Sequence, residues 1–127
     1  TLGMIYVRGK NVNIMENDTT QGYAHAARIA FELGCDVAKT VWTGSAESFA
    51  KVCQAAPIPL LVAGGPSTGN SKQILRMVKQ SLDAGGSGVC MGRQIFAHKD
   101  VTAITKALVM IVHHGASVEE AIERCSL

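Results

Sequence analysis

Short apolar runs alternate along the chain with longer segments in which apolar residues recur every three or four positions. The runs are apolar without regular alternation, as in strands covered on both faces, and the longer segments have the spacing of amphipathic helices. This order predicts four βα units. The expected strands are residues 2–7, 36–42, 60–63 and 89–91, and the expected helices are residues 20–33, 45–56, 72–84 and 100–114, with a short helix after Ser117.

Capping residues support several of these helix boundaries. Ser117, followed three residues later by Glu120, is the pattern of a complete capping box. Ser45 is followed by Ser48 at that position, so its box is predicted to be imperfect. The Thr19–Thr20 pair provides candidate N-caps for the first helix. The three helices are therefore expected to begin close to these residues.

Strands of this kind, each followed by a helix, predict an α/β protein with a parallel sheet, either a barrel or a doubly wound fold. Glycines and polar residues follow the strands. In both folds the carboxyl ends of the strands form the ligand-binding face. Four βα units are half of a closed eight-stranded barrel, which typically needs about 250 residues. The chain therefore has the size expected of a half-barrel.

Composition narrows the class to one soluble globular domain, because the 127 residues are 47% hydrophobic and 17% charged. A net charge of +2 without a basic stripe, and an aromatic content of 5%, argue against a nucleic-acid partner. The apolar stretch Ala107–Val112 is far shorter than the roughly 20 residues of a membrane span. No leader sequence opens the chain, so a cytoplasmic protein without a membrane partner is expected.

The four cysteines are widely spaced and form no C-x-x-C pair. This spacing argues against a zinc or redox site, and free, partly buried thiols are expected instead. No metal and no cofactor is therefore predicted. His113 and His114 come at the end of a predicted helix, where interaction with the helix dipole is a more common role than catalysis.

Lys39 lies inside the apolar, β-branched run Val37–Trp42, where a solvated surface lysine has no obvious reason to be. An ammonium among such neighbours would lose hydration, which would lower its pKa and make the neutral amine available as a nucleophile toward a carbonyl carbon. Lys39 is therefore a candidate Schiff-base residue. The alternative is an edge strand in which Lys39 points to water while its neighbours point inward.

Two glycine motifs follow the third and fourth predicted strands. In Ala63-Gly64-Gly65 the missing Cβ atoms would let backbone N–H groups approach an anion closely. In Gly92-Arg93 a glycine leaves space at the strand end, and the planar guanidinium of Arg93 can donate two hydrogen bonds to phosphate oxygens. Taken singly, each motif is also common in ordinary turns. Their occurrence in consecutive units predicts a phosphate site like the one that many barrels build after their last two strands.

Together with Lys39, these motifs resemble the C-terminal half of class I aldolases of the archaeal, DhnA type. That family includes fructose-bisphosphate aldolase, 2-amino-3,7-dideoxy-D-threo-hept-6-ulosonate synthase and phospho-autoinducer-2 thiolase. The resemblance covers essentially the whole chain and implies the four C-terminal βα units of a TIM (β/α)8 barrel. It rests on YVRGK (6–10), AHAAR (24–28), DVAKT (36–40), TG (43–44), AGGP (63–66) and MGR (91–93), which occur in family order.

The resemblance implies that Lys39 forms the Schiff base with a phosphorylated ketose. It implies that Tyr6, at the end of the preceding strand, transfers a proton during carbon–carbon cleavage or formation. Arg8 and Lys10 lie at the mouth of the implied site and are candidates for binding a second charged group. The alternative for both is a solvated cation in a loop.

The resemblance also implies a binding site for the substrate phosphate. Its residues are the backbone at Ala63, Gly64 and Gly65, with Gly92 and Arg93. The implied partner is thus a phosphorylated sugar substrate. A homo-oligomer is expected once the barrel is complete.

Three features depart from the family pattern. Val7 occupies a position where many members have proline, and Ser67 a position where lysine often follows the glycines. The acid/base aspartate of the family, which lies on the first barrel strand, is not in this sequence. Since each positioned acid or base contributes roughly 10²–10⁴-fold to such a reaction, complete activity is expected to need a missing N-terminal half.

The family offers three enzymatic alternatives. The aldolase cleaves a bisphosphate, the heptulosonate synthase performs a transaldol transfer, and the thiolase moves an acetyl group to coenzyme A. Tyr6 and Thr43-Gly44 favour the first two, with a fructose-bisphosphate aldolase-like lyase preferred, whereas Val89–Arg93 and Val112–His114 are closer to the thiolase. The non-enzymatic alternative is a half-barrel module that binds a phosphorylated ligand, in which Lys39 is only a phosphate or edge cation.

Overall fold

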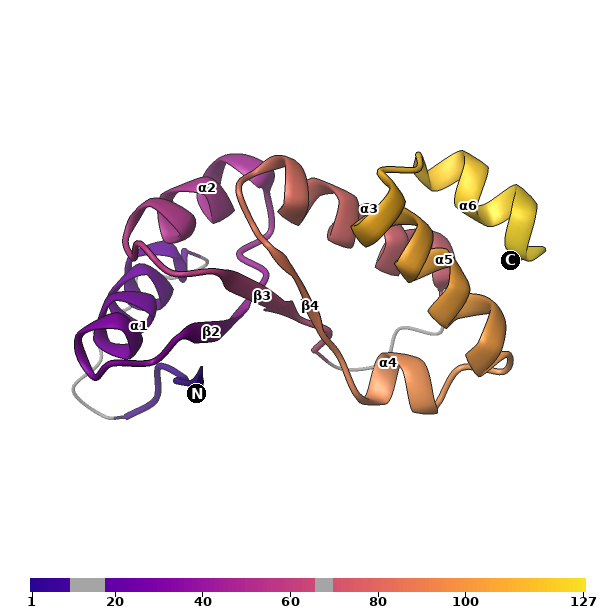
Figure 1. Ribbon diagram of the computed structural model, residues 1–127. Coiled ribbons are helices and arrows are strands. Elements are labelled where there is room, and N and C mark those ends of the chain that lie inside the picture. The colour runs from indigo at the N-terminus through magenta and orange to yellow at the C-terminus, as the bar shows by residue number, and fades with distance from the viewer. Residues whose placement is uncertain (10–17, 66–69) are drawn as a thin grey trace.

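The computed structural model describes residues 1–9, 18–65 and 70–127, and within them the predicted order of βα units is confirmed. The strands form one sheet in sequence order, and every neighbouring pair is parallel (Figure 1). Sequential parallel pairing of this kind requires a helical crossover after each strand. The strands are β1 (Leu2–Met4), β2 (Val37–Val41), β3 (Leu60–Ala63) and β4 (Gly88–Cys90).

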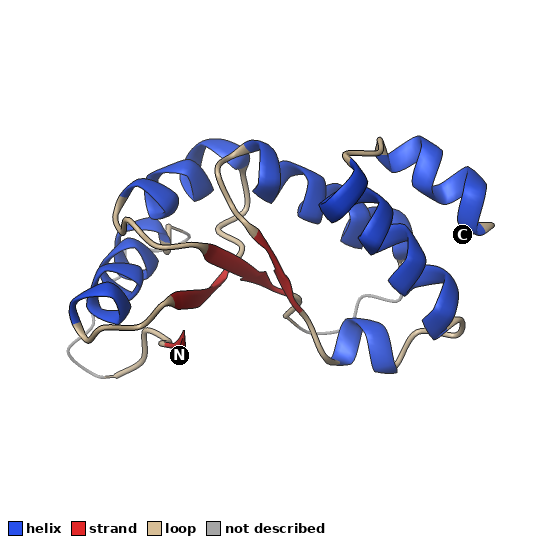
Figure 2. Ribbon diagram, in the orientation of Figure 1, coloured by secondary structure: helices blue, strands red, loops and turns tan. Residues whose placement is uncertain are grey.

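Helices α1, α2 and α3 arch over one side of this sheet, whereas the opposite side of the strands faces open space (Figure 2). The helices pack in a row, with α1 on α2, α2 on α3, α3 on α5 and α5 on α6. None of the described helices is long and apolar enough to cross a membrane. The helices are α1 (Thr20–Glu32), α2 (Ala46–Gln54), α3 (Ser71–Asp83), α4 (Arg93–Phe96), α5 (Val101–His114) and α6 (Val118–Cys125).

The core divides into two apolar clusters on the helical side of the sheet. One joins α1 and α2 to β2 and β3, and the other joins α3, α5 and α6. The first cluster includes Ala30, Ala38 and Leu60, and the second includes Leu75 and Ile104. The burial of this face fixes which side chains of each strand point toward the helices, and the alternation of a strand sends the others to the open side.

The caps of α2 and α6 differ from the predictions. Ser45 and Ser48 form both hydrogen bonds of a capping box, so the predicted imperfection is wrong. The short Ser48 hydroxyl reaches the backbone N–H of Ser45 directly. At Ser117 the side chain accepts from the backbone N–H of Glu120, but the Glu120 carboxylate pairs with Arg124 instead of completing the box.

The start of α1 also corrects a prediction. Thr19 is the N-cap residue, but its side chain makes no capping hydrogen bond. The backbone N–H of Thr20 instead donates to the Asp18 carboxylate at 2.9 Å. A carboxylate accepts from a helix-terminal N–H more strongly than a hydroxyl does, because it carries charge toward the positive end of the helix.

Strand β1 is shorter than predicted, since it ends at Met4 rather than at residue 7. Its pairing with β2 covers three residues, from Leu2 with Val37 to Met4 with Lys39. In the described sheet β1 is an edge strand with a neighbour on one side. Beyond Met4 the chain no longer pairs with β2. Helix α2 likewise ends at Gln54 instead of residue 56.

Candidate active site

Lys39 lies on the open face of the sheet. Its chain neighbours Ala38 and Thr40 are buried among the helices, and the alternation of the strand places Lys39 on the opposite side, half-buried. In a parallel sheet, residues in register share a face, and Lys39 is in register with Met4 and Leu61. Within the described residues Lys39 makes no ion pair. Its amine is therefore available on a face that is apolar around it.

Tyr6 follows β1, two residues after Met4, which is in register with Lys39. Met4 is 61% exposed, Ile5 packs into the cluster of α1 and α2, and Tyr6 is again exposed. The Arg8 guanidinium carbon lies 5.9 Å from the centroid of the Tyr6 ring, within range of a cation–π contact. The predicted Lys10 lies outside the described residues.

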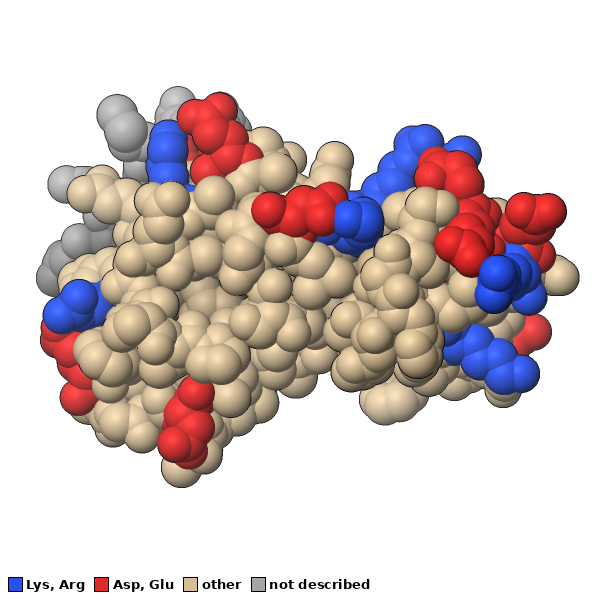
Figure 3. All heavy atoms as spheres, turned by 45° about the horizontal axis from the view of Figure 1, so that its top comes forward, with Lys and Arg blue, Asp and Glu red and all other residues tan. Residues whose placement is uncertain are grey.

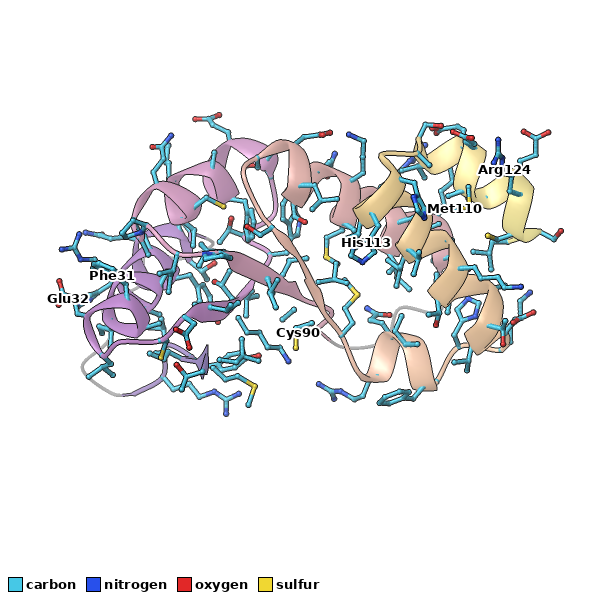
Figure 4. The ribbon with its side chains drawn as sticks, in the orientation of Figure 1. Phe31, Glu32, Cys90, Met110, His113 and Arg124 are labelled. Atoms are coloured by element: carbon cyan, nitrogen blue, oxygen red, sulfur yellow. The ribbon has the colours of Figure 1, made fainter. Side chains whose placement is uncertain are left out.

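The two glycine motifs meet at the carboxyl ends of β3 and β4. Ala63, the last residue of β3, is in register with Cys90, the last residue of β4. In Figure 4 Cys90 lies on the open side of β4, away from α2. A Cβ atom on Gly64 would lie 3.1 Å from Cγ of Met91 and 2.9 Å from Cγ of Gln94. Because that space is filled, Gly64 can only be glycine without a shift of its neighbours.

Gly65, Gly92 and Arg93 complete this pair of turns. Gly65 has a φ of +64°, in the left-handed region that favours glycine. Gly92 precedes α4, and Arg93 is its first residue, exposed to solvent and without an ion pair within the described residues. Ser67, which departs from the family pattern after these glycines, lies outside the described residues.

Gln94 joins the two turns and was missed in the sequence. Its side-chain Nε2 donates to the backbone oxygen of Gly64 at 2.8 Å, and the residue is 4% exposed. The sequence carries no clear signal for this role, because a glutamine after Arg93 is equally compatible with a solvated turn. The hydrogen bond spans thirty residues of sequence, so no local pattern could reveal it.

A histidine anchors the start of α3 beside these turns. Nε2 of His98 lies 2.8 Å from Oγ of Ser71, the first residue of α3. Its Nδ1 lies 3.0 Å from the backbone nitrogen of Asp100, the N-cap residue of α5. One imidazole thus connects the beginnings of two helices. This connection holds α3 close to the carboxyl end of β4.

The cysteines are free and half-buried, as predicted. Burial raises the pKa of the Cys53 thiol, which lies on α2 at the cluster of α1 and α2. The thiol form is therefore favoured there at neutral pH. Among the described residues, no group of three or more metal-ligating side chains comes together.

Comparison with known proteins places these features in a family context. A family model described as DeoC/LacD family aldolase matches residues 1–98. The chain is 40% identical over 126 residues to a 2-amino-3,7-dideoxy-D-threo-hept-6-ulosonate synthase of Halobacterium salinarum, covering 99% of this chain and 46% of that protein. It is 34% identical over 116 residues to a 2-amino-4,5-dihydroxy-6-oxo-7-(phosphonooxy)heptanoate synthase of Streptomyces griseus, covering 91% and 42%.

Solved structures extend the comparison to the fold. An archaeal fructose 1,6-bisphosphate aldolase matches with a TM-score of 0.82 and 34% identity, over 90% of this chain and 45% of that one. The fructose-bisphosphate aldolase of Slackia heliotrinireducens matches with a TM-score of 0.85 and 29% identity, over 98% and 42%. The chain thus spans about half the length of these relatives. The prediction of βα units from a TIM-barrel aldolase is confirmed.

Proposed function

The chain belongs to the DeoC/LacD family of aldolases, and from this premise we propose that it supplies the Schiff-base and phosphate-binding half of a class I aldolase acting on a phosphorylated ketose. The observation that supports the proposal is that Lys39 faces the open side of β2, while glycine turns follow β3 and β4 at the carboxyl edge of the same sheet. A nucleophilic amine and a phosphate-binding turn on one sheet would suit a ketone that carries a phosphate. A solved relative of 33% identity is described as a Schiff-base-forming fructose-1,6-bisphosphate aldolase.

In the proposed reaction the neutral Nζ of Lys39 adds to the ketone carbon, and loss of water from the carbinolamine gives an iminium ion. The iminium accepts the electron pair of the breaking carbon–carbon bond, which leaves an enamine on Lys39 and releases an aldehyde. The phenolate form of Tyr6 takes the proton from the hydroxyl group that becomes the aldehyde carbonyl. The Tyr6 phenol then returns this proton to the enamine carbon, and addition of water to the resulting iminium releases the second product and restores the amine.

The phosphate is held at the other end of the substrate in this proposal. Backbone N–H groups of the Ala63–Gly65 turn and of Gly92 would bind its oxygens, and Arg93 would add a charge-assisted pair. Arg8, already in contact with the Tyr6 ring, would meet a second charged group of the substrate. An acid/base aspartate for imine formation would come from the other half of the barrel.

Borohydride trapping tests the proposal. Dihydroxyacetone phosphate, the simplest phosphorylated ketose, is expected to give a stable secondary amine on the peptide that contains Lys39. In the complete enzyme the Lys39→Arg variant keeps the charge and the fold but cannot form an imine, so we expect complete loss of trapping and of turnover. Lys51→Arg, an exposed change on α2, is the matched control and should behave like the wild type. Turnover by the Lys39→Arg variant would exclude the Schiff-base mechanism.

A second candidate function is a transaldol-type synthase. The observation in its favour is the 40% identity to the heptulosonate synthase over nearly the whole chain. Product analysis distinguishes the two functions: a lyase cleaves fructose 1,6-bisphosphate alone, whereas a transaldol enzyme turns over only when an acceptor aldehyde is added. Formation of acetyl-coenzyme A would indicate the thiolase. Binding of the sugar phosphate without any trapped adduct would indicate a binding module.

A further inference from the structure

The side chain of Gln94 is built into the space between the two glycine turns. Its Cγ would be 2.9 Å from a Cβ on Gly64, so the glutamine packs directly over the glycine. Its Nε2 donates to the Gly64 oxygen at 2.8 Å, and the residue is 4% exposed. The side chain of Gln94, on α4, therefore binds the backbone directly after β3 and connects the two turns.

The hydrogen bond determines the direction of a backbone donor. The peptide between Gly64 and Gly65 is planar and trans, so its C=O and N–H point in opposite directions. The hydrogen bond to Gln94 fixes the direction of the Gly64 C=O. It therefore also fixes the direction of the Gly65 N–H, which is opposite. Without this bond the plane would be free to rotate, because neither glycine has a Cβ atom to restrict it.

We propose that Gln94 is a positioning residue that sets the phosphate affinity of the site by locking the Gly64–Gly65 peptide, without touching the phosphate itself. The inference rests on the proposed function, because it assumes that this turn binds the substrate phosphate. A preorganised backbone donor loses no orientational freedom when the anion binds. Removing the lock should therefore weaken ligands that carry a phosphate and leave ketone chemistry at Lys39 unchanged.

The decisive variant is Gln94→Met in the complete enzyme. Methionine has a similar length and volume, so the packing over Gly64 is kept while the donor is lost. The concentration of dihydroxyacetone phosphate that half-saturates borohydride trapping should rise about tenfold, as expected for one orienting hydrogen bond. Trapping at saturation, and half-saturation by unphosphorylated dihydroxyacetone, should not change. Gln94→Leu also lacks the donor and adds no charge, so it serves as the second variant if Gln94→Met is insoluble.

Ser81→Ala is the matched control. Ser81 is fully buried in α3, and its Oγ donates to the backbone oxygen of Val78 at 2.8 Å, a bond of the same kind. The backbone oxygen of Ser81 accepts from the N–H of Gly86, which precedes β4. Ser81 therefore lies at the amino end of β4. A general loss of stability would affect both variants, whereas an effect on the phosphate turn should appear in Gln94→Met alone.

The outcomes separate the inference from the proposed function. Three results would overturn the role of Gln94 and leave the aldolase proposal standing. They are equal weakening of the binding of both ketones in Gln94→Met, no change in that variant, and the same effect in Ser81→Ala. If the wild type traps neither ketone, the proposed function fails, and calorimetric titration with inorganic phosphate decides the inference separately. Weaker phosphate binding by Gln94→Met would support it, and equal binding, or no binding by the wild type, would overturn it.

Discussion

Lys39 and Thr40 are adjacent in sequence and lie in opposite environments. Lys39 faces the open side of the sheet, while Thr40 is 3% exposed on the helical side. Within the described residues the Thr40 hydroxyl has no hydrogen-bond partner. A buried hydroxyl without a partner loses its hydration without compensation, so Thr40 weakens the fold at the strand that carries Lys39.

Replacing Thr40 with valine should stabilise the protein. The methyl group has nearly the same shape as the hydroxyl and needs no partner, so we expect the free energy of unfolding to rise by about 1 kcal/mol. Denaturant unfolding measures this change, and trapping at Lys39 should remain as in the wild type. A loss of stability would mean that the hydroxyl has a partner, such as a bound water.

Arg93 is the exposed cation of the phosphate turns. Arg93→Ala removes a charge-assisted pair but leaves the backbone donors, so binding of dihydroxyacetone phosphate should weaken by about 10- to 100-fold. Binding of dihydroxyacetone should hardly change. Arg28→Ala, on the exposed surface of α1, removes the same charge far from the turns and is the control. If Arg93→Ala weakens both ketones equally, Arg93 serves the fold instead of the phosphate.

Among the elements, α1 depends on a charged residue just before its first turn. Hydrogen bonds from the side chain and the backbone N–H of Thr20 lower the pKa of Asp18. A carboxylate with a lowered pKa in the folded state adds stability above its unfolded pKa of about 3.9. That stability is lost as the pH falls through the folded value, where the group becomes protonated.

Asp18→Ala should therefore lower the melting temperature at pH 7, and its effect should shrink as the pH is lowered below the unfolded pKa of about 3.9, as at pH 3. Ser117→Ala removes an uncharged cap from α6, so its effect should be similar at both pH values. Thermal unfolding of both variants at each pH makes the comparison. A pH-independent effect of Asp18→Ala would show that the charge of Asp18 does not contribute.

At the scale of the whole molecule, the two sides of the sheet differ. On the helical side, acidic and basic side chains are interspersed (Figure 3), and four of the described ion pairs join residues one helical turn apart. The other side exposes Leu2 and Met4. A groove of about 540 Å³ runs between β4 and α5, with Val89, Leu108 and His113 in its lining, and Figure 4 shows His113 in that interval.

The 127-residue chain alone is therefore expected to associate. β1 and β4 are edges of the described sheet, and unpaired edges beside an apolar face promote pairing with another chain. Two copies could close on each other, or a complementary half-barrel could cover the face. Sedimentation should show oligomers or aggregates. Aldol assays of the chain alone should show almost no activity.

Co-expression with the N-terminal half that the family resemblance implies should restore a soluble species and activity together. The chain matches 46% of the Halobacterium relative, and a complementary half-barrel would supply the remaining strands. The chain expressed alone is the control. A well-behaved monomer with full turnover would contradict this prediction and make Tyr6, Lys39 and Arg93 a sufficient site.

The sequence alone determined the order of the elements, the parallel sheet and the position of Lys39 within a strand. These features follow from local patterns: apolar runs, helical spacing and glycines at strand ends act over a few residues. The family resemblance then implied which side chains share a site. β3 was predicted with its observed bounds, Leu60–Ala63, because Pro59 and Gly64 limit it on both sides.

Only the tertiary structure decided how those pieces are held. The bond from Gln94 to Gly64 and the contact of His98 with Ser71 join residues that are 30 and 27 positions apart. Such contacts depend on the packing of whole βα units, which no local pattern encodes. The same is true of Thr40, whose missing partner is visible only once the helices close over β2. Local chemistry therefore determined the candidate groups, and packing decided their environment.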